Sequence, residues 1–167
     1  MKFGGTSVED ARAFARVARI VGAQRAERPV VVVSAMSRVT DALLAGVEMA
    51  AGGDAELALR SLEEHFERHA LVARTLPAGA RDEFFVELAD AERALGELLR
   101  RVERAVEARP LLQDQIVAYG ECLSAKLLAA VLSEHTLPAA YVDARRCIIT
   151  NEFDLQILII ISCNSFI

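Results

Sequence analysis

The stretch that decides the fold is "RPVVVVSAM", residues 28–36. Its four consecutive valines are β-branched, and a short apolar run of this kind favours a strand over a helix. A strand without alternating polar residues is typical of a sheet that is covered on both faces, as parallel sheets are. The polar residues that follow the valines should then lie at the carboxyl end of the strand, where α/β proteins bind their ligands.

The residues before this strand complete a β-α-β unit. "MKFGGTSVED", residues 1–10, begins as a short strand and continues through two glycines. Residues 8–26 place apolar side chains at helical spacing, which predicts an amphipathic helix. Ser7, followed three residues later by Asp10, fits a capping box at the start of that helix.

The middle of the chain is predicted to be helical. Helical spacing recurs over residues 39–51, 54–76, 80–108 and 112–135, and glycine or proline ends the first three segments at Gly52–Gly53, Pro77 and Pro110. Strand character returns over residues 138–150. We therefore expect an α/β protein in which residues 54–108 form an inserted helical hairpin that projects from the sheet.

The last residues differ in composition from the rest. Residues 1–147 contain two isoleucines, Ile20 and Ile116, whereas residues 148–167 contain seven, and alanine and arginine do not recur after Arg146. Residues 154–167 therefore form an atypical tail. The tail is either a divergent strand or sequence foreign to the parent protein, such as a frame-shifted or fused end, and we favour the second interpretation.

The overall composition excludes some functions. A formal net charge of −5, with arginines spaced among acidic residues, does not favour a nucleic-acid partner. The three cysteines, Cys122, Cys147 and Cys163, form no close pair, and no signal pattern precedes them, so we expect reduced thiols and a cytoplasmic location. The apolar run near the C-terminus is shorter than the roughly 20 residues of a membrane span, so no membrane partner is expected.

The segment "KFGGTS", residues 2–7, is a candidate phosphate loop. Two glycines let a ligand approach the backbone, and the N-terminus of a following helix favours an anion. Lys2 could supply positive charge to a phosphoryl group during transfer. The alternative is an ordinary turn into a capped helix, with a surface lysine. The segment is neither a Walker loop nor a G-x-G-x-x-G fingerprint.

Two further segments carry candidate binding residues. Ser34 and Thr40 flank the loop after the valine strand, although Thr40 could serve only as the cap of the next helix. Glu121 follows Gly120 within an apolar helical stretch, where a carboxylate could bind a substrate ammonium group. Alternatively, Glu121 could be a first-turn glutamate that the helix dipole favours.

Histidine and cysteine give weaker signals. His65 and His69 have the i,i+4 spacing of zinc ligands on one helix face, but no third ligand is evident, and a solvated helix face is the favoured interpretation. Cys122 and Cys147 have no histidine close in sequence, which favours packed residues over nucleophiles.

Taken together, four motifs resemble the aspartate kinase family, which has the amino acid kinase fold. They are "KFGGTSV" from residue 2, "VVVSAM" from residue 31 followed by "TDALL" from residue 40, "YGECLSAKL" from residue 119 and "VDARRCIIT" from residue 142. They occur in the order of the family and cover residues 1–153. The resemblance implies a three-layer αβα arrangement with a mainly parallel central sheet, in which residues 54–108 are a helical insertion.

The resemblance also implies an activity. Members of this family use ATP to phosphorylate the side-chain carboxylate of L-aspartate, which gives 4-phospho-L-aspartate, the first step toward lysine, threonine and methionine. By this resemblance Ser34, Thr40 and Glu121 bind aspartate. Lys2, Phe3, Gly4 and Gly5 contact ATP, and Lys2 neutralises charge during transfer. Mg²⁺ is expected with the nucleotide rather than in a protein metal site, and the parent enzyme is expected to be a homo-oligomer.

The chain departs from the family in two ways. Met1 directly precedes Lys2, where family members carry several more apolar residues, and the family pattern continues beyond the point where this chain stops. We therefore expect an N-terminal part of an aspartate kinase that is poorly active alone. The alternatives are another amino acid kinase, such as a glutamate or carbamate kinase, or a non-catalytic interaction module built on residues 54–108. The residues "FGGTS" speak against the first alternative.

Overall fold

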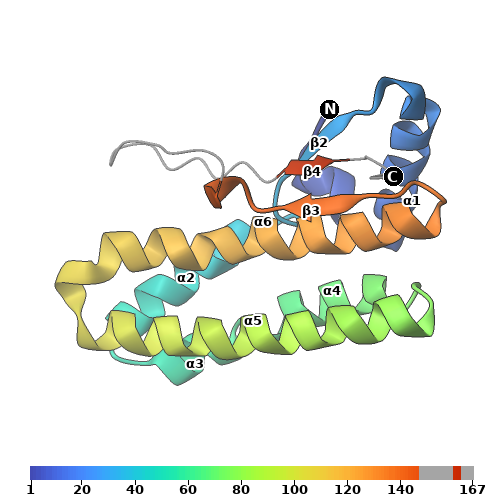
Figure 1. The fold of residues 1–167 in the computed structure, drawn as a ribbon. Helices are drawn as coiled ribbons and strands as arrows, with labels where there is room; N and C mark the ends of the chain where they lie inside the picture. Colours follow the sequence, from blue (N-terminus) through green and yellow to red (C-terminus); the bar gives the residue numbers. More distant parts are fainter. Residues whose placement is uncertain (147–159, 163–167) are drawn as a thin grey trace.

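A computed structural model describes residues 1–146 and 160–162 of the chain. Figure 1 shows a small sheet above two tiers of long helices. The strands are β1 (Lys2–Phe3), β2 (Val30–Val33), β3 (Ala140–Val142) and β4 (Ile160–Ser162). The helices are α1 (Ala11–Ala23), α2 (Val39–Ala51), α3 (Ala55–Arg60), α4 (Glu63–Ala73), α5 (Ala78–Arg104) and α6 (Arg109–Glu134). Four short 3₁₀ turns are η1 (Gly5–Val8), η2 (Arg25–Glu27), η3 (Val106–Ala108) and η4 (Ala144–Arg146).

The sheet has the order β1-β2-β4-β3. Strands β1 and β2 are parallel, with Lys2 opposite Val32 and Phe3 opposite Val33, and α1 connects them. Strand β4 is antiparallel to both of its neighbours, so β1, β2 and β3 all run in one direction. The predicted α/β class and the N-terminal β-α-β unit are confirmed. Three residues of the atypical tail, Ile160–Ser162, pair within this sheet, and the other residues of the tail lie outside the described residues.

The two faces of the sheet differ. Val31 and Val33 of β2 are buried, and α6 runs under the sheet in contact with β2, β3 and β4 (Figure 1). Val30 is 49% exposed on the other face, so the prediction that this strand is buried on both faces is wrong for the described residues. The physical reason is that α6 packs against one face only, and alternate strand residues point to opposite faces.

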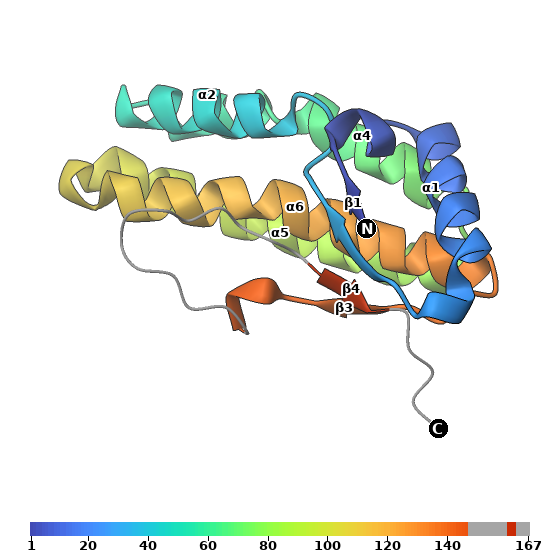
Figure 2. The same cartoon turned by 90° about the horizontal axis from the view of Figure 1, so that it is seen from above.

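The inserted helices belong to the same core as the rest of the chain. Helix α5 packs along α6, and α3 packs against α2 and α5 (Figures 1 and 2). Leu95 and Leu99 of α5 are fully buried between these helices. Residues 54–108 therefore lie along α6 and α2, and the expected projection from the sheet is wrong. The apolar faces of α3 and α5 are buried from water by packing against α2 and α6.

Helix α6 is the centre of this core. It is the one helix in the described residues that is long and apolar enough to cross a membrane. However, 67% of its most apolar stretch is buried inside the protein, between the sheet and α5, as the central helix of a packed core would be. Its apolar composition is therefore explained by burial against both the sheet and α5.

Several helix ends differ from the sequence expectation. Helix α1 begins at Ala11 because the Asp10 carboxylate, 2.7 Å from the Ala13 nitrogen, accepts its hydrogen bond and caps the helix, whereas Ser7 lies in η1. The segment 54–76 divides into α3 and α4 at Ser61–Leu62. Helix α2 has the predicted bounds.

The predicted stop at Pro110 is wrong. Helix α5 already ends at Arg104, and Pro110 lies in the first turn of α6. A proline is well placed there, because the first-turn N–H groups of a helix have no intrahelical acceptor.

Helix α6 crosses the loop after β2 at Gly120. A Cβ atom added there would lie 2.8 Å from the Cβ of Ala35 and 3.2 Å from a methyl group of Val39. Real Cβ atoms do not approach another carbon as closely as 2.8 Å. The helix axis and the loop are therefore in contact only because residue 120 has no side chain.

We predict that Gly120→Ala lowers the free energy of unfolding by roughly 1–3 kcal/mol, because the new methyl group overpacks the contact with Ala35. Alanine otherwise stabilises a helix by about 1 kcal/mol relative to glycine. Gly79→Ala in α5 is the matched control, since its Cβ would meet nothing within 4 Å. Urea unfolding measures both variants, and equal stabilisation of the two would contradict the close crossing.

Candidate functional site

The candidate site is built where the loops after β1 and β2 meet. The Ser34 N–H donates to the Phe3 carbonyl at 3.1 Å, and the Ser37 N–H donates to the Gly5 carbonyl at 3.2 Å. A Cβ on Gly5 would lie 2.7 Å from the Ala35 carbonyl oxygen, which is a backbone atom that cannot rotate away. The two loops are thus held main chain to main chain, and Gly5 is required by sterics.

Gly4 and Lys2 face open space. Nothing lies within 4 Å of the position that a Gly4 side chain would occupy. The Lys2 side chain is exposed, and within residues 1–146 and 160–162 its ammonium group has no hydrogen-bond or ion-pair partner. The accessible backbone of Gly4 directly follows β1, which carries the unpaired cation of Lys2, and this combination fits an anionic group such as phosphate.

Phe3 plays a different part in the structure. Its side chain is half-buried and packs against the hydrophobic core, on the opposite side of the strand from Lys2. Its carbonyl is bonded to the Ser34 N–H. Any contact from Phe3 to a ligand would therefore come from its backbone.

Helix α1 does not begin directly after the two glycines, as the sequence had predicted. The four-residue 3₁₀ turn η1 comes first, with the Ser7 N–H bonded to the Gly4 carbonyl at 2.9 Å. The N-terminus of α1 is already capped by the Asp10 carboxylate. The α1 dipole therefore stabilises a bound anion less than the sequence predicted, because the Asp10 carboxylate already compensates the positive end of the helix.

Glu121 reaches the same loop from α6. The backbone amide of Ala35 interacts with its carboxylate, while Oε2 is buried without a hydrogen-bond partner among the described residues. Burial raises the pKa of Glu121, and hydrogen bonds from the backbone of Ala35 and of Glu121 itself offset part of this rise. Since α6 begins at Arg109, the first-turn interpretation of Glu121 is wrong. A partly buried carboxylate with a free oxygen suits a cationic ligand group.

Ser34 and Thr40 lie on the β2–α2 connection. Ser34 is half-buried directly after β2. Thr40 is the second residue of α2, whose cap position is Arg38 with a left-handed φ of 69° and no side-chain cap, so the interpretation of Thr40 as the cap is wrong. The structure therefore gathers Phe3–Gly5, Ser34 and Glu121 around Ala35. The described contacts do not link Lys2 or Thr40 to Glu121.

His69 does not lie on a solvated helix face. His69 is 1% exposed, with its Nδ1 atom 2.7 Å from the His65 carbonyl, and its buried Nε2 atom has no hydrogen-bond partner within residues 1–146 and 160–162. The described residues contain no group of three His, Cys, Asp or Glu side chains placed to hold a metal ion. The favoured solvated-face interpretation is wrong for His69, which is a core residue.

Cys122 is packed rather than reactive. It is 8% exposed and forms no disulfide, and burial raises the pKa of its thiol, which keeps it protonated. The prediction that Cys122 is a packed residue is confirmed, and Cys147 lies outside the described residues.

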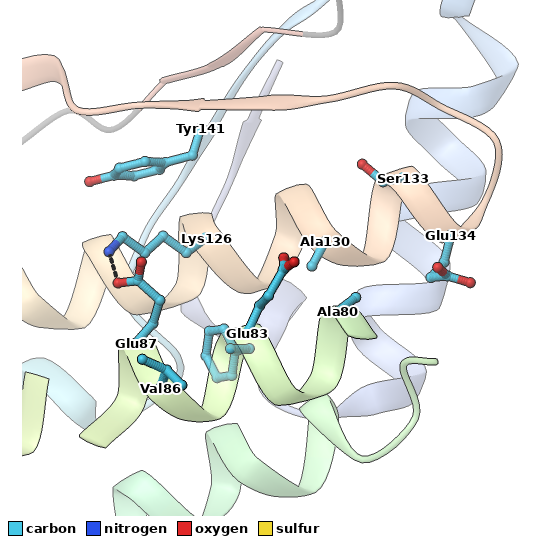
Figure 3. A pocket seen from close by; sticks show the side chains of 10 residues that line it. Ala80, Glu83, Val86, Glu87, Lys126, Ala130, Ser133, Glu134 and Tyr141 are labelled. Carbon is cyan, nitrogen blue, oxygen red and sulfur yellow. Dashed lines mark hydrogen bonds and ion pairs between the residues drawn. The ribbon is translucent and has the colours of Figure 1, made fainter. Parts of the chain in front are cut away.

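A cavity in the described part of the chain lies elsewhere. It has a volume of about 660 Å³ and opens between α5, α6 and β3 (Figure 3). Lys126 contacts Glu87 and lies 5.6 Å from the centre of the Tyr141 ring. None of the predicted site residues lines this cavity, and its one cation is already paired, so the chemistry points to the β1–β2 loops instead.

Residues that sequence reasoning missed hold this arrangement together. Ala35 is its centre, Ser37 bonds to Gly5, and Arg68 of α4 donates to the Ser37 carbonyl at 2.8 Å. No sequence signal marked Ala35 or Ser37, since both roles belong to the backbone. Arg68 lies inside "HFERH" and looked like one more solvated charge on a helix.

The chain is similar to known proteins in both sequence and structure. The model of the amino acid kinase family matches residues 1–161. The chloroplastic bifunctional aspartokinase/homoserine dehydrogenase 1 of Zea mays is 33% identical over 151 residues, and that of Arabidopsis thaliana is 36% identical over 145 residues. These matches cover 90% and 86% of this chain. Among solved structures, E. coli aspartokinase III in complex with aspartate and ADP matches 91% of the chain, with a TM-score of 0.79 and 28% identity.

The matches cover a small part of each relative. The chain spans 16% of the length of either plant enzyme and 32% of the E. coli aspartokinase III chain. The resemblance to the N-terminal part of aspartokinases and the amino acid kinase fold are both confirmed by these matches.

Burial lowers the pKa of His69 to about 4, so the folded protein keeps this imidazole neutral while the unfolded chain binds a proton near pH 6.5. Stability from this residue is present above pH 6.5 and is lost as the pH falls toward 4. We predict that the protein loses roughly 2 kcal/mol more stability than His69→Leu between pH 7.5 and 5. Urea unfolding at both pH values measures the difference. The exposed His135→Gln serves as control, and equal losses for protein and His69→Leu would refute the assignment.

The raised pKa of Glu121 changes stability with pH in the opposite direction from the lowered pKa of His69. Its ionised form is less stable in the folded than in the unfolded protein, so this carboxylate costs stability as the pH rises above its ordinary value. We predict that Glu121→Gln raises the free energy of unfolding at pH 7, and that this gain disappears near pH 4, where the carboxyl group is largely protonated in both states. The exposed Glu92→Gln should change neither value, and a loss of stability in Glu121→Gln at pH 7 would contradict the prediction.

Proposed function

The chain belongs to the amino acid kinase family, and from this premise we propose that its residues form part of an aspartate kinase site. The proposed reaction transfers the γ-phosphoryl group of ATP to the side-chain carboxylate of L-aspartate and gives 4-phospho-L-aspartate and ADP. The relatives are named as aspartokinases, and the E. coli structure was solved with aspartate and ADP. Their agreement supports a kinase and this substrate.

The observation that carries the proposal is the convergence on Ala35. A glycine loop and a carboxylate from a different helix approach one residue at the carboxyl end of two parallel strands. In such sheets this edge is where ligands bind. The loop has positive character, from Lys2 and backbone N–H groups, whereas Glu121 is negative. A site with these two ends suits a substrate that carries an ammonium group and accepts a phosphoryl group.

We assign one role to each group. The open backbone at Gly4, the adjoining backbone of Gly5 and the unpaired ammonium of Lys2 hold the nucleotide phosphates. Glu121 binds the α-ammonium group of aspartate, and Ser34 and Thr40 supply hydroxyl donors to its carboxylates. Phe3 contributes its backbone and its packing, which fixes the strand.

These roles follow from the chemistry of the transfer. A carboxylate oxygen of aspartate attacks the γ-phosphorus, and the bond from this phosphorus to the bridging oxygen breaks, so the electron pair leaves with ADP. No proton has to move, since the attacking carboxylate is already ionised. Two anions must approach each other, so Lys2 lowers the barrier by neutralising charge on the transferring oxygens.

The residues present fit ATP, since Gly4 leaves open space beside an unpaired lysine. Mg²⁺ would be held mainly by the nucleotide phosphates, because the described residues contain no ligand cluster of their own. Bound Mg²⁺ would neutralise charge that develops on the phosphate oxygens.

The wider assignments are proposals of the same kind. The activity would be the first step of lysine, threonine and methionine biosynthesis, and the enzyme would be a homo-oligomer without nucleic-acid or membrane partners. We propose a cytoplasmic location, while the plant relatives carry the word chloroplastic in their names. Because the chain spans 16% of the plant relatives, we expect the 167-residue chain alone to turn over poorly.

The alternatives have less support. The matched relatives carry aspartokinase names, and this favours aspartate over glutamate or carbamate as the phosphoryl acceptor. A separate interaction module over residues 54–108 is disfavoured, because α3 and α5 share the buried core of α2 and α6. Their removal would expose that core rather than free a module.

We predict that Lys2→Ala lowers kcat at least about 100-fold, since it removes the charge on the transferring group. The test places residues 1–161 in the matching segment of E. coli aspartokinase III and traps the acyl phosphate with hydroxylamine as the hydroxamate. Lys126→Ala is the matched control, because Lys126 pairs with Glu87 in the remote cavity. Retention of most activity by Lys2→Ala, or no hydroxamate from the unmodified hybrid, would count against the proposed function.

A further inference from the structure

One side chain of the insertion reaches both loops of the candidate site. Arg68, on α4, donates from Nη1 to the Ser37 carbonyl at 2.8 Å and from Nη2 to the Glu9 carbonyl at 3.3 Å. Ser37 belongs to the loop after β2, and Glu9 directly follows η1 in the loop after β1. A residue from the middle of the chain thus contacts two segments that lie 28 positions apart in sequence (9 and 37).

Both carbonyls belong to backbone that sets the site. The N–H of Ser37 is bonded to the Gly5 carbonyl, so the position of residue 37 fixes how Gly5 meets Ala35. The next residue, Arg38, has a left-handed φ of 69°. This conformation costs a non-glycine residue on the order of 1 kcal/mol and persists only where the surroundings hold it. A charged hydrogen bond to the Ser37 carbonyl supplies such a hold.

The segment of α4 that carries Arg68 is anchored in the core. Arg68 projects from a helix whose neighbouring residues Phe66, His69 and Ala70 are buried in the core. The ring nitrogen Nδ1 of His65 lies 3.5 Å from Nη1 of Arg68 and borders the guanidinium on the same helix. A planar guanidinium can bond two acceptors from two different nitrogens in fixed directions, whereas a lysine offers one point charge. The geometry therefore requires arginine rather than any cation.

We propose that Arg68 is a positioning residue, by which the helical insertion holds the glycine loop and the β2–α2 loop in the geometry of the site. It acts through the carbonyls of Ser37 and Glu9 and touches no reacting group. Its effect on catalysis rests on the proposed function, but its effect on the two loops does not. The insertion is then part of the site, because it supplies the support that keeps Gly5 against Ala35 and Ser37.

The proposal is tested on the 167-residue chain by amide hydrogen exchange. In Arg68→Gln the Ser37 N–H should exchange about 10-fold faster, because one charged hydrogen bond that holds the loop is lost. The amide of Leu99, buried in α5, should not change and reports global opening. Arg74→Gln is the matched control, since Arg74 directly follows the same helix and, among the described residues, its guanidinium pairs with Glu67 and not with the two loops.

Two further measurements separate positioning from packing and from the proposed function. Arg68→Lys keeps the positive charge and the aliphatic part of the side chain. If packing alone mattered, this variant would restore slow exchange of the Ser37 N–H. We expect fast exchange instead, because a lysine cannot bond both carbonyls as the guanidinium does. Unchanged Ser37 exchange in Arg68→Gln, or rescue by Arg68→Lys, would overturn the proposal. Titration with Mg·ADP should give weaker binding to Arg68→Gln than to Arg74→Gln. If the unaltered chain bound no Mg·ADP, the proposed function would fail for this chain while the exchange result would still decide the role of Arg68.

Discussion

The structure depends on the contacts around Ala35. This residue is enclosed by Gly5 from the loop after β1 and by Gly120 from α6, and a Cβ on either glycine would lie within 2.8 Å of it. Strand pairing, the loop after β2 and the central helix therefore all meet at one point. Because packed interiors do not absorb an extra methyl group cheaply, the identity of two glycines fixes the relative position of three elements.

The same constraint connects fold and function. Glu121 follows Gly120, so the close crossing of α6 carries a carboxylate to the backbone of Ala35. This arrangement leaves a buried carboxylate oxygen that has no hydrogen-bond partner in the part of the chain that the structure describes, and binding sites often break local rules of this kind. Arg68 adds a second connection, from the inserted helices to both loops. The site is thus supported from the strands, from α6 and from the insertion.

Much of this could be predicted from sequence, for physical reasons. The valine run and the helical spacing identified β2 and α2, and the glycines after Lys2 marked the loop that meets Ala35. Backbone contacts at Ala35 and Ser37 carry no side-chain signal and were missed. Helix ends were misplaced where a cap or a proline acted, at Asp10 and Pro110. The buried His69 was misread because helical spacing does not reveal which face a tertiary neighbour covers.

We propose that the loops around Ala35 bind phosphate and aspartate. The most direct measurement is NMR titration of the isotope-labelled chain with Mg·ATP and then with L-aspartate. Amide shifts should change at Gly4 and Gly5 with the nucleotide and at Ser34, Ala35 and Glu121 with aspartate. Shift changes confined to the cavity around Lys126 and Tyr141, with none at Gly4, Gly5 or Ala35, would contradict it.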